Sequence, residues 1–245
     1  MMLSETRHLG SLSIAVIVPV GADEAPPPEI FFERVRGDPT LASPAALVVA
    51  AHEGISSNVR EAFSTAGARL RLSPAPRGQR LREAVAVLPF EESSVLLFLH
   101  CDTLLPAGWE TEVRAALARG AAGGAFRLGF SGGGARMAWV AWWANLRTRV
   151  TRVPYGDQAP FVRRDVYERL GGHRPWPILE DRDFSRRLVA AEGRARVALI
   201  PASVATSPRR YLEKGVWKTV RKNWEILRGV KRGEAPEELA KRYRE

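Results

Sequence analysis

The sequence predicts an α/β fold, a mostly parallel β-sheet with helices on both of its faces. Short β-branched apolar runs alternate with amphipathic segments along the first half of the chain. Most of these runs are almost continuously apolar, as in strands that are covered on both faces, and "ARLRLSP" alternates as a half-exposed strand does. The chain has 245 residues, 45% of them apolar, which is enough for a substantial core. We therefore expect a single domain spanning residues 1–245.

The helices and strands of the first half are predicted from turn-forming residues as well as from the apolar pattern. The loop "GADEAPPP" ends the first strand, and Gly67 and Gly120 end two helices. "SSNVREAF" offers a Ser or Asn cap for its helix. We predict strands at 13–20, 45–51, 68–74 and 94–100, and helices at 56–67, 77–88 and 108–120. This alternating order is typical of a parallel sheet.

The second half is less regular, and we expect it to build a second subsite. A glycine loop precedes a long helical segment, and Gly193 ends a later one. We predict strands at 123–130 and 195–201 and helices at 132–152, 179–193 and 215–232, with a short strand followed by a helix within 155–172. The most C-terminal helical segment, at about 212–245, is basic and amphipathic.

The composition of the chain limits which binding partners and which cellular compartment we expect. The net charge is +10, and residues 208–245 hold 12 Lys and Arg against 6 Glu. No nucleic-acid motif accompanies this excess, so we expect no nucleic-acid partner. A solvated helical face or a peripheral contact with an anionic membrane would explain it. The chain has no apolar run of roughly 18 residues, no signal-peptide pattern and one cysteine, which favours the cytoplasm.

Two tryptophan patterns concern packing. Trp139, Trp142 and Trp143 lie at spacings of three and four, which most often marks a core-facing stripe. Less often, such a stripe is a platform for an acceptor or a membrane. In the basic C-terminal helix, we expect one apolar face to pack on the domain, made of Val216, Val220, Trp224 and Leu227.

The string "VLLFLHCDTLLP" ends the most apolar predicted strand on polar residues. In open α/β sheets, ligands bind beyond the carboxyl ends of the strands. Because side chains alternate along a strand, His100 and Asp102 should share a face, with Cys101 pointing away into the core. An imidazole and a carboxylate so placed can reach one divalent ion. The alternative is a loop-capping Asp beside a His at the edge of the core.

A second acidic pair, Glu180 and Asp181, stands where a helix begins. Acidic residues in a first turn also complement the helix dipole, which would explain them without a function. Two other turns favour a functional role. "YGDQ" is acidic, and "TSPRR" carries paired guanidinium groups suited to phosphate. A metal-type carboxylate, a basic turn and a carboxylate base together indicate nucleotide-activated group transfer.

On these strings the chain resembles a family 2 glycosyltransferase, of the subgroup associated with arsenosugar biosynthesis. The resemblance runs through "IAVIVP", "LLFLHCDTLLP", "GAFRL", "RVPYGDQAPFVRRDVYERLGG", "ILEDRDFSRRL" and "TSPRR", over nearly the whole chain. It implies a GT-A fold, a nucleoside-diphosphate sugar donor, an unknown acceptor and an inverting mechanism. It also implies Mn²⁺ or Mg²⁺ on the donor diphosphate, held by Asp102 with His100.

The resemblance assigns roles to further residues. Asp181 is the expected catalytic base, with Glu180 beside it. The sugar or the acceptor would meet Tyr155, Gly156, Asp157 and Gln158. Contacts to the nucleotide and its phosphates would come from Pro19, Asp23, Glu24, Glu53, Arg77, Gly78, Arg80, Arg209 and Arg210.

The donor half departs from the family pattern. Ala22 stands at the usual Asn position of the first loop, Ala50 replaces the Asp that ends the second strand, and Arg82 stands at the Asn position of a third loop. One interpretation is an active enzyme with a changed donor, or with a base held by other groups such as Glu53 or Arg80. The other is a degenerate member that binds ligand, or docks on a membrane or partner, without turnover.

Overall fold

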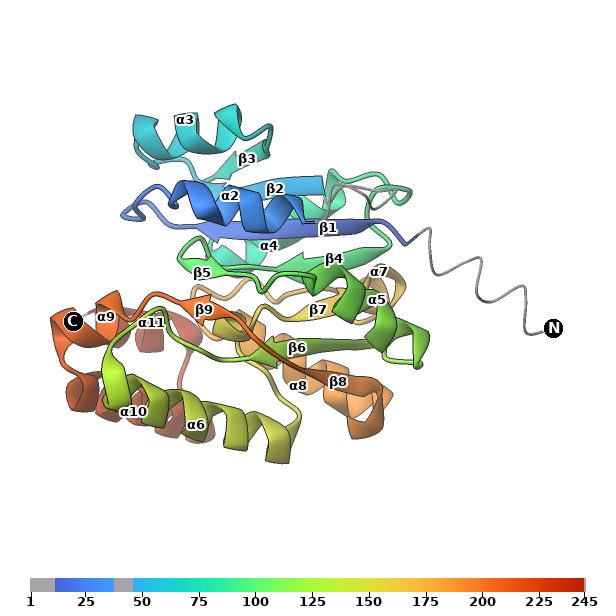
Figure 1. Cartoon of the computed structure of the whole chain (residues 1–245). Coiled ribbons are helices and arrows are strands. Elements are labelled where there is room, and N and C mark those ends of the chain that lie inside the picture. The colour runs from blue at the N-terminus through green and yellow to red at the C-terminus, as the bar shows by residue number, and fades with distance from the viewer. Residues whose placement is uncertain (1–11, 38–45, 245) are drawn as a thin grey trace.

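The computed structural model describes residues 12–37 and 46–244 and forms a layered α/β structure (Figure 1). One seven-stranded sheet runs in the order β3-β2-β1-β4-β7-β6-β8. Its strands are β1 (Ile14–Val20), β2 (Ala46–His52), β3 (Arg69–Ser73), β4 (Val95–Phe98), β6 (Gly123–Arg127), β7 (Phe161–Arg163) and β8 (Val197–Ser203). Ala45, the first residue of the predicted second strand, lies outside the described residues.

The sheet is mostly parallel, as the sequence predicts. β3, β2, β1 and β4 run parallel to one another, and β8 runs parallel to β6. The exception is β7, which is antiparallel to both β4 and β6. It follows directly on the turn that contains Gly156, so it returns the chain from the carboxyl edge of the sheet.

Helices cover both faces of the sheet, which confirms the predicted layers. One core joins alternate β1 residues such as Val16 and Val18 to α2 (Glu29–Arg36), α3 (Ser57–Thr65) and α5 (Trp109–Ala118). The other joins Ala15 and Ile17 to α4 (Arg77–Ala86), α7 (Arg164–Arg169) and α8 (Glu180–Glu192). The Ser56 hydroxyl accepts a hydrogen bond from the Val59 amide and caps α3, as predicted.

A small second sheet joins the two halves at the carboxyl edge. β5 (Thr103–Leu104) pairs antiparallel with β9 (Ala205–Thr206). The hydroxyl groups of Thr103 and Thr206 lie 2.9 Å apart, and the Ser207 amide donates to the Asp102 carbonyl over 3.0 Å. This pairing holds the "TSPRR" turn beside "HCD", although 103 residues separate the two threonines.

The C-terminal segment folds differently from the single helix that we expected. It forms α9 (Arg209–Lys214), α10 (Val216–Lys231) and α11 (Pro236–Arg244), which Figure 1 shows gathered near α6 (Gly134–Thr151). Gly215 and Gly233 separate the three helices with φ angles of 84° and 78°. Such angles end a helix and suit glycine.

One packing prediction was correct only in part, and another was wrong. Of the predicted α10 face, Val216 is buried and Val220 packs against the same cluster, whereas Trp224 is 62% exposed. The stripe of Trp139, Trp142 and Trp143 on α6 faces outward instead of into the core. The helix packs its other face, through Met137, Val140 and Ala141. Because both faces of α6 are apolar, periodicity could not tell which face is buried.

Candidate functional site

The polar residues that end β4 lie in a turn and not on the strand. β4 ends at Phe98, and the Thr103 amide donates to the His100 carbonyl over 3.1 Å. The prediction that His100 and Asp102 share a strand face was therefore wrong, because the alternation has already stopped. Asp102 is exposed, and the Thr103 hydroxyl donates to its Oδ1 over 3.2 Å. Cys101 is buried, as expected, and its thiol donates to Glu24.

Asp181 stands in the first turn of α8 with its carboxylate held by two backbone amides. Its Oδ2 accepts from the Gly156 amide over 2.5 Å, and its Oδ1 accepts from the Arg182 amide over 2.7 Å. Burial opposes ionisation, but the charge of Arg77 and the two amides outweigh it and lower the pKa of Asp181. The group is therefore an oriented carboxylate at neutral pH, with lone pairs left to accept a proton.

Gly156 is the point where three parts of the site meet. A Cβ atom at this position would lie 2.7 Å from His100 Nε2 and 2.9 Å from Asp181 Oδ2. Both distances are shorter than Cβ atoms show in real contacts, so a larger residue here would displace one or both of these side chains. The turn after β4, the "YGDQ" turn and the start of α8 thus converge on one spot at the carboxyl edge of the sheet.

Glu180 has a different environment from its neighbour Asp181. Its side chain is buried, and its Oε1 pairs with Arg77 at the start of α4. Its Oε2 is buried with no hydrogen-bond partner in the described part of the chain. Burial raises the pKa of Glu180, and the charge of Arg77 only partly offsets that effect. Glu180 therefore anchors α8 to α4, and Arg77 supplies positive charge to both acidic residues.

In the "YGDQ" turn, the side chain of Gln158 is hydrogen-bonded, whereas Asp157 has a buried oxygen without a hydrogen-bond partner among the described residues. Gln158 is buried, and its amide oxygen accepts from the Thr148 hydroxyl over 2.8 Å, while its nitrogen donates to the Phe126 carbonyl. Gln158 therefore braces the turn against α6 and β6. Asp157 has a buried Oδ1 without a hydrogen-bond partner among the described residues. Burial raises the pKa of Asp157; the charges of Arg147 and His100 oppose that effect, and those of Asp181 and Asp102 add to it.

The predicted donor-side residues separate into structural and accessible groups. The Gly78 amide donates to the Trp176 carbonyl, so it is not free for a phosphate. Arg80 is buried and donates to the carbonyls of Ala75 and Val20. Pro19 is buried within β1. Asp23, Glu53, Arg209 and Arg210 remain exposed and can meet a ligand.

Two residues near the site, Arg147 and Tyr243, carried no sequence signal. The Arg147 guanidinium lies 3.5 Å from the ring centre of Tyr155, and Arg210 lies 4.0 Å from the ring centre of Tyr243 on α11. Burial raises the pKa of the Tyr243 hydroxyl, and the charges of Arg210 and Arg77 oppose that effect. The contact of Arg210 with Tyr243 joins residues far apart in the chain, and that of Arg147 with Tyr155 depends on how the turn folds back on α6, so no local motif marks either contact.

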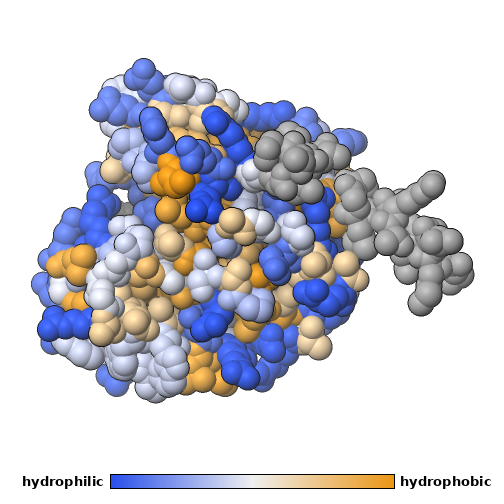
Figure 2. All heavy atoms as spheres, in the orientation of Figure 1, coloured by the Kyte–Doolittle hydropathy of each residue, from blue (hydrophilic) through white to orange (hydrophobic). Residues whose placement is uncertain are grey.

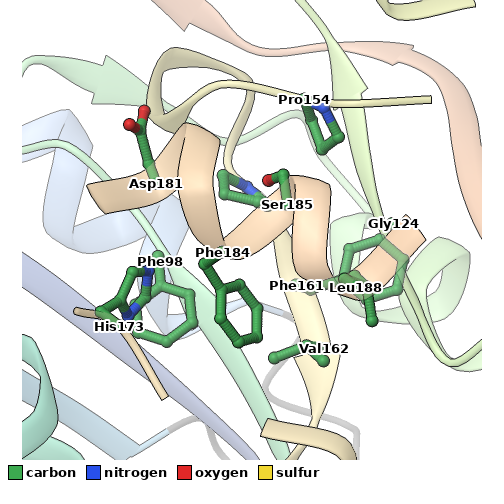
Figure 3. Close-up of a pocket in the computed structure, with 11 residues that line it drawn as sticks. Phe98, Gly124, Pro154, Phe161, Val162, His173, Asp181, Phe184, Ser185 and Leu188 are labelled. Atoms are coloured by element: carbon green, nitrogen blue, oxygen red, sulfur yellow. The ribbon is translucent and has the colours of Figure 1, made fainter. Parts of the chain in front are cut away.

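An apolar pocket lies beneath the first turns of α8 (Figure 3). Phe98, His173 and Phe184 line it, and Figure 3 shows the Asp181 carboxylate directed away from these rings. His173 Nδ1 and the Tyr167 hydroxyl share a hydrogen bond of 3.0 Å. The lining is almost entirely apolar, so this pocket belongs to the packing that supports Asp181. The polar groups above it form the candidate site.

The residues fit a divalent metal only as a partner of a diphosphate. No group of three or more His, Cys, Asp or Glu side chains within the described ranges could hold a metal ion. Mg²⁺ and Mn²⁺ usually take one or two carboxylates and complete their shells with water and substrate phosphates. Asp102 is an exposed carboxylate next to the basic "TSPRR" turn, which suits that arrangement.

Neither a protein-family model nor a curated protein matches this sequence. Several solved structures, however, resemble the fold of this chain. Glucosyl-3-phosphoglycerate synthase from Mycobacterium tuberculosis, in complex with Mn²⁺, UDP and glucosyl-3-phosphoglycerate, aligns with a TM-score of 0.55 at 16% identity, over 84% of this chain and 76% of its own. Mannosyl-3-phosphoglycerate synthase from Rubrobacter xylanophilus aligns with a TM-score of 0.56 at 15% identity, over 94% of this chain and 78% of its own. The chain has the GT-A fold.

A third GT-A structure, TarS of S. aureus, aligns with a TM-score of 0.56 at 10% identity. The match covers 86% of this chain but 40% of TarS. The GT-A prediction from the sequence strings is thus confirmed at the level of the fold. No helix in the described ranges is both long and apolar enough to cross a membrane.

Proposed function

We propose that the protein is a metal-dependent inverting glycosyltransferase that moves a sugar from a nucleoside-diphosphate sugar to an acceptor hydroxyl group. The observation that carries the proposal is the Asp181 carboxylate, oriented by two amides beside His100 at the carboxyl edge of a GT-A sheet. The sequence strings support family 2 and its arsenosugar-associated subgroup. We infer a cytoplasmic enzyme without a nucleic-acid partner.

In this reaction the acceptor oxygen bonds to the anomeric carbon as the bond from that carbon to the diphosphate breaks. The acceptor proton passes to Asp181, which is ionised at neutral pH because its pKa is lowered. The diphosphate leaves with additional negative charge, which Arg209 and Arg210 offset at the start of α9. Asp102 with His100 would hold Mn²⁺ or Mg²⁺, which would supply further positive charge at the diphosphate.

Other residues of the site orient the substrates. Tyr155, Gly156 and Asp157 face the reacting groups from the "YGDQ" turn, and Gln158 fixes that turn. Asp157 is a second candidate base, because its Oδ1 is without a hydrogen-bond partner among the described residues and its pKa is raised. Asp23, Glu24 and Glu53 lie in the loops after β1 and β2, where the nucleotide would bind.

The test compares Asp181→Asn with Asp157→Asn. An asparagine side chain in place of Asp181 keeps one of the two oxygens that accept amide hydrogen bonds, so we expect a folded protein with a modestly lowered melting temperature and unchanged nucleotide affinity. Transfer should fall on the order of 10²- to 10⁴-fold, as removal of a general base typically does. The assay follows release of nucleoside diphosphate from UDP- and GDP-sugars, with a cell extract as the acceptor source. A large loss for Asp157→Asn alone would make Asp157 the base.

The second candidate function is a degenerate, ligand-binding family member. Gly78 and Arg80, two of the predicted donor contacts, are committed to backbone partners, which favours it. This alternative predicts nucleotide binding by the wild-type protein without release of nucleoside diphosphate from any donor. It also predicts that Asp181→Asn changes neither property.

A further inference from the structure

Four tryptophan side chains form one exposed surface across α6 and α10. Trp139, Trp142 and Trp143 on α6 are 43%, 55% and 48% exposed, and Trp217 on α10 is 64% exposed. Their rings touch in sequence. The ring centres lie 4.9 Å apart for Trp142 and Trp143, 6.0 Å for Trp143 and Trp139, and 5.2 Å for Trp139 and Trp217. We call these four residues the tryptophan surface.

Further apolar residues extend the tryptophan surface along both helices. Leu146 and Val150 continue it on α6 and are 36% and 58% exposed, and Trp224 continues it on α10, two turns after Trp217. Figure 2 shows pale and orange residues along the lower edge of the molecule, over α6. Isolated exposed apolar residues are ordinary, but a contiguous aromatic patch marks a surface that contacts another molecule.

The opposite face of α6 already has its packing partners. The Asn145 side chain exchanges two hydrogen bonds with the Leu128 backbone, and Met137 and Val140 pack against Val216 of α10. The exposed face of α6 is therefore not needed for the packing of the core. It faces solvent on a helix that is held in place from behind.

Basic side chains alternate with the exposed tryptophans. On α10, Trp217, Arg221, Trp224 and Arg228 follow one another at spacings of four, three and four, so they share one face. Exposed residues nearby add positive charge; they are Arg136, Arg149, Lys214, Lys218 and Lys231. Two exposed acids, Glu213 and Glu225, lie on α9 and α10, and Glu225 pairs with Arg221.

We propose that the tryptophan surface docks on the interfacial layer of an anionic lipid bilayer. Tryptophan is the side chain that favours the headgroup region of a membrane, and neighbouring Lys and Arg are attracted to anionic lipids. A second copy of this chain is a poor occupant, because a two-fold contact would set the same basic residues against each other. The docking is independent of the transferase activity. It holds α9, with Arg209 and Arg210, close to the bilayer.

The experiment is co-sedimentation of the full chain with phosphatidylcholine vesicles, and with vesicles that also contain phosphatidylglycerol. We expect binding to the anionic vesicles to be tighter by on the order of tenfold or more, and to weaken as salt increases. Trp142→Ser with Trp217→Ser should abolish recovery, and Lys218→Gln with Arg228→Gln should remove the preference for anionic lipid. The matched control is Val87→Ser with Phe90→Ser, which removes two exposed apolar residues after α4 and should bind normally.

A second measurement does not depend on the variants folding. Brominated acyl chains quench tryptophans that enter a bilayer, so anionic brominated vesicles should quench the wild-type fluorescence. Equal recovery with neutral and anionic vesicles, or binding by the folded tryptophan variant, overturns the proposal. No recovery and no quenching also overturns it and points to a protein partner. A dimer without lipid, lost in the tryptophan variant, overturns it too and identifies a second copy as the occupant.

Discussion

Gly156 shows how one missing side chain can organise a site. Its amide holds Asp181, and its Cα hydrogens occupy the space between that carboxylate and His100. We predict that Gly156→Ala displaces both side chains while the sheet below keeps its packing. Small displacements of reacting groups can cost about 10²-fold in rate. Transfer should fall by about that factor with a small change in melting temperature. An unchanged rate would mean that His100 and Asp181 do not act together.

His173 gives the protein a predictable response to acid. Its ring is 2% exposed and packs on Phe98 and Phe184, and burial lowers its pKa to about 3. The unfolded chain binds the proton near a pH of about 6.5. Between these two values the unfolded state holds more of the His173 proton, so the contribution of His173 to the free energy of unfolding decreases as the pH falls.

We predict a slope of about 1 kcal/mol per pH unit below about pH 6 that His173→Phe removes. Phenylalanine keeps the aromatic packing but cannot be protonated. The measurement is urea unfolding of both proteins between about pH 4.5 and 7. Asp181, whose pKa is lowered, loses its stabilising contribution as the pH falls through its unfolded pKa of about 3.9, so most of that loss lies below this window. Parallel stability curves for the two proteins would rule out His173 as the source.

At the scale of elements, Gly78 at the start of α4 was predicted to contact a phosphate, but its surroundings indicate a packing role. A Cβ atom on Gly78 would lie 1.9 Å from the Arg174 carbonyl oxygen, and the Gly78 amide donates to Trp176. We predict that Gly78→Ala pushes α4 from the segment before α8 and lowers the free energy of unfolding by about 1–3 kcal/mol. Gln79→Ala, the next residue on the same helix, is the control. Normal stability with weaker nucleotide binding would restore the phosphate role of Gly78.

The elements that the sequence predicted best are those that local rules determine. Continuous apolar runs predicted the strands β1, β2 and β4, and Gly193 ends α8 as expected. Short elements that depend on distant partners were missed, namely α2, α9, α11 and the β5–β9 pair. The exposed face of α6 was assigned to the core, because both of its faces are apolar and the choice between them rests on tertiary packing.

The same division holds for the site. The acidic motifs predicted that Asp102 follows a strand and that Asp181 begins a helix, and these two points meet at the carboxyl edge of the sheet. The contact of Arg210 with Tyr243 joins α9 to α11, and no local sequence pattern predicts it. Gly78 and Arg80 resemble phosphate contacts in a motif, yet their backbone partners are visible only in three dimensions.

At the scale of the whole molecule, the carboxyl edge places Asp102, the proposed metal ligand, next to a basic turn, and a diphosphate could contact both. Asp102 is an exposed carboxylate, and the paired strands β5 and β9 hold it beside the turn that carries Arg209 and Arg210. Because no cluster of three metal-type side chains occurs among the described residues, the protein alone offers Mn²⁺ few ligands. Binding of metal and binding of nucleotide should therefore depend on each other.

We predict that Mn²⁺ alone leaves the melting temperature unchanged, and that a matching nucleoside diphosphate raises it more with Mn²⁺ than without. A ligand at about 100 times its Kd stabilises a folded protein by about 2.7 kcal/mol, and each kcal/mol is worth about 2–4 °C in a chain of this size. The screen covers UDP, GDP, ADP, CDP and dTDP, each with and without Mn²⁺. Asp102→Ala should abolish only the metal-dependent part of the shift. Equal shifts with and without Mn²⁺ would instead show that Arg209, Arg210 and their neighbours bind the diphosphate without a metal, and the metal-dependent mechanism would fail while the GT-A fold stood.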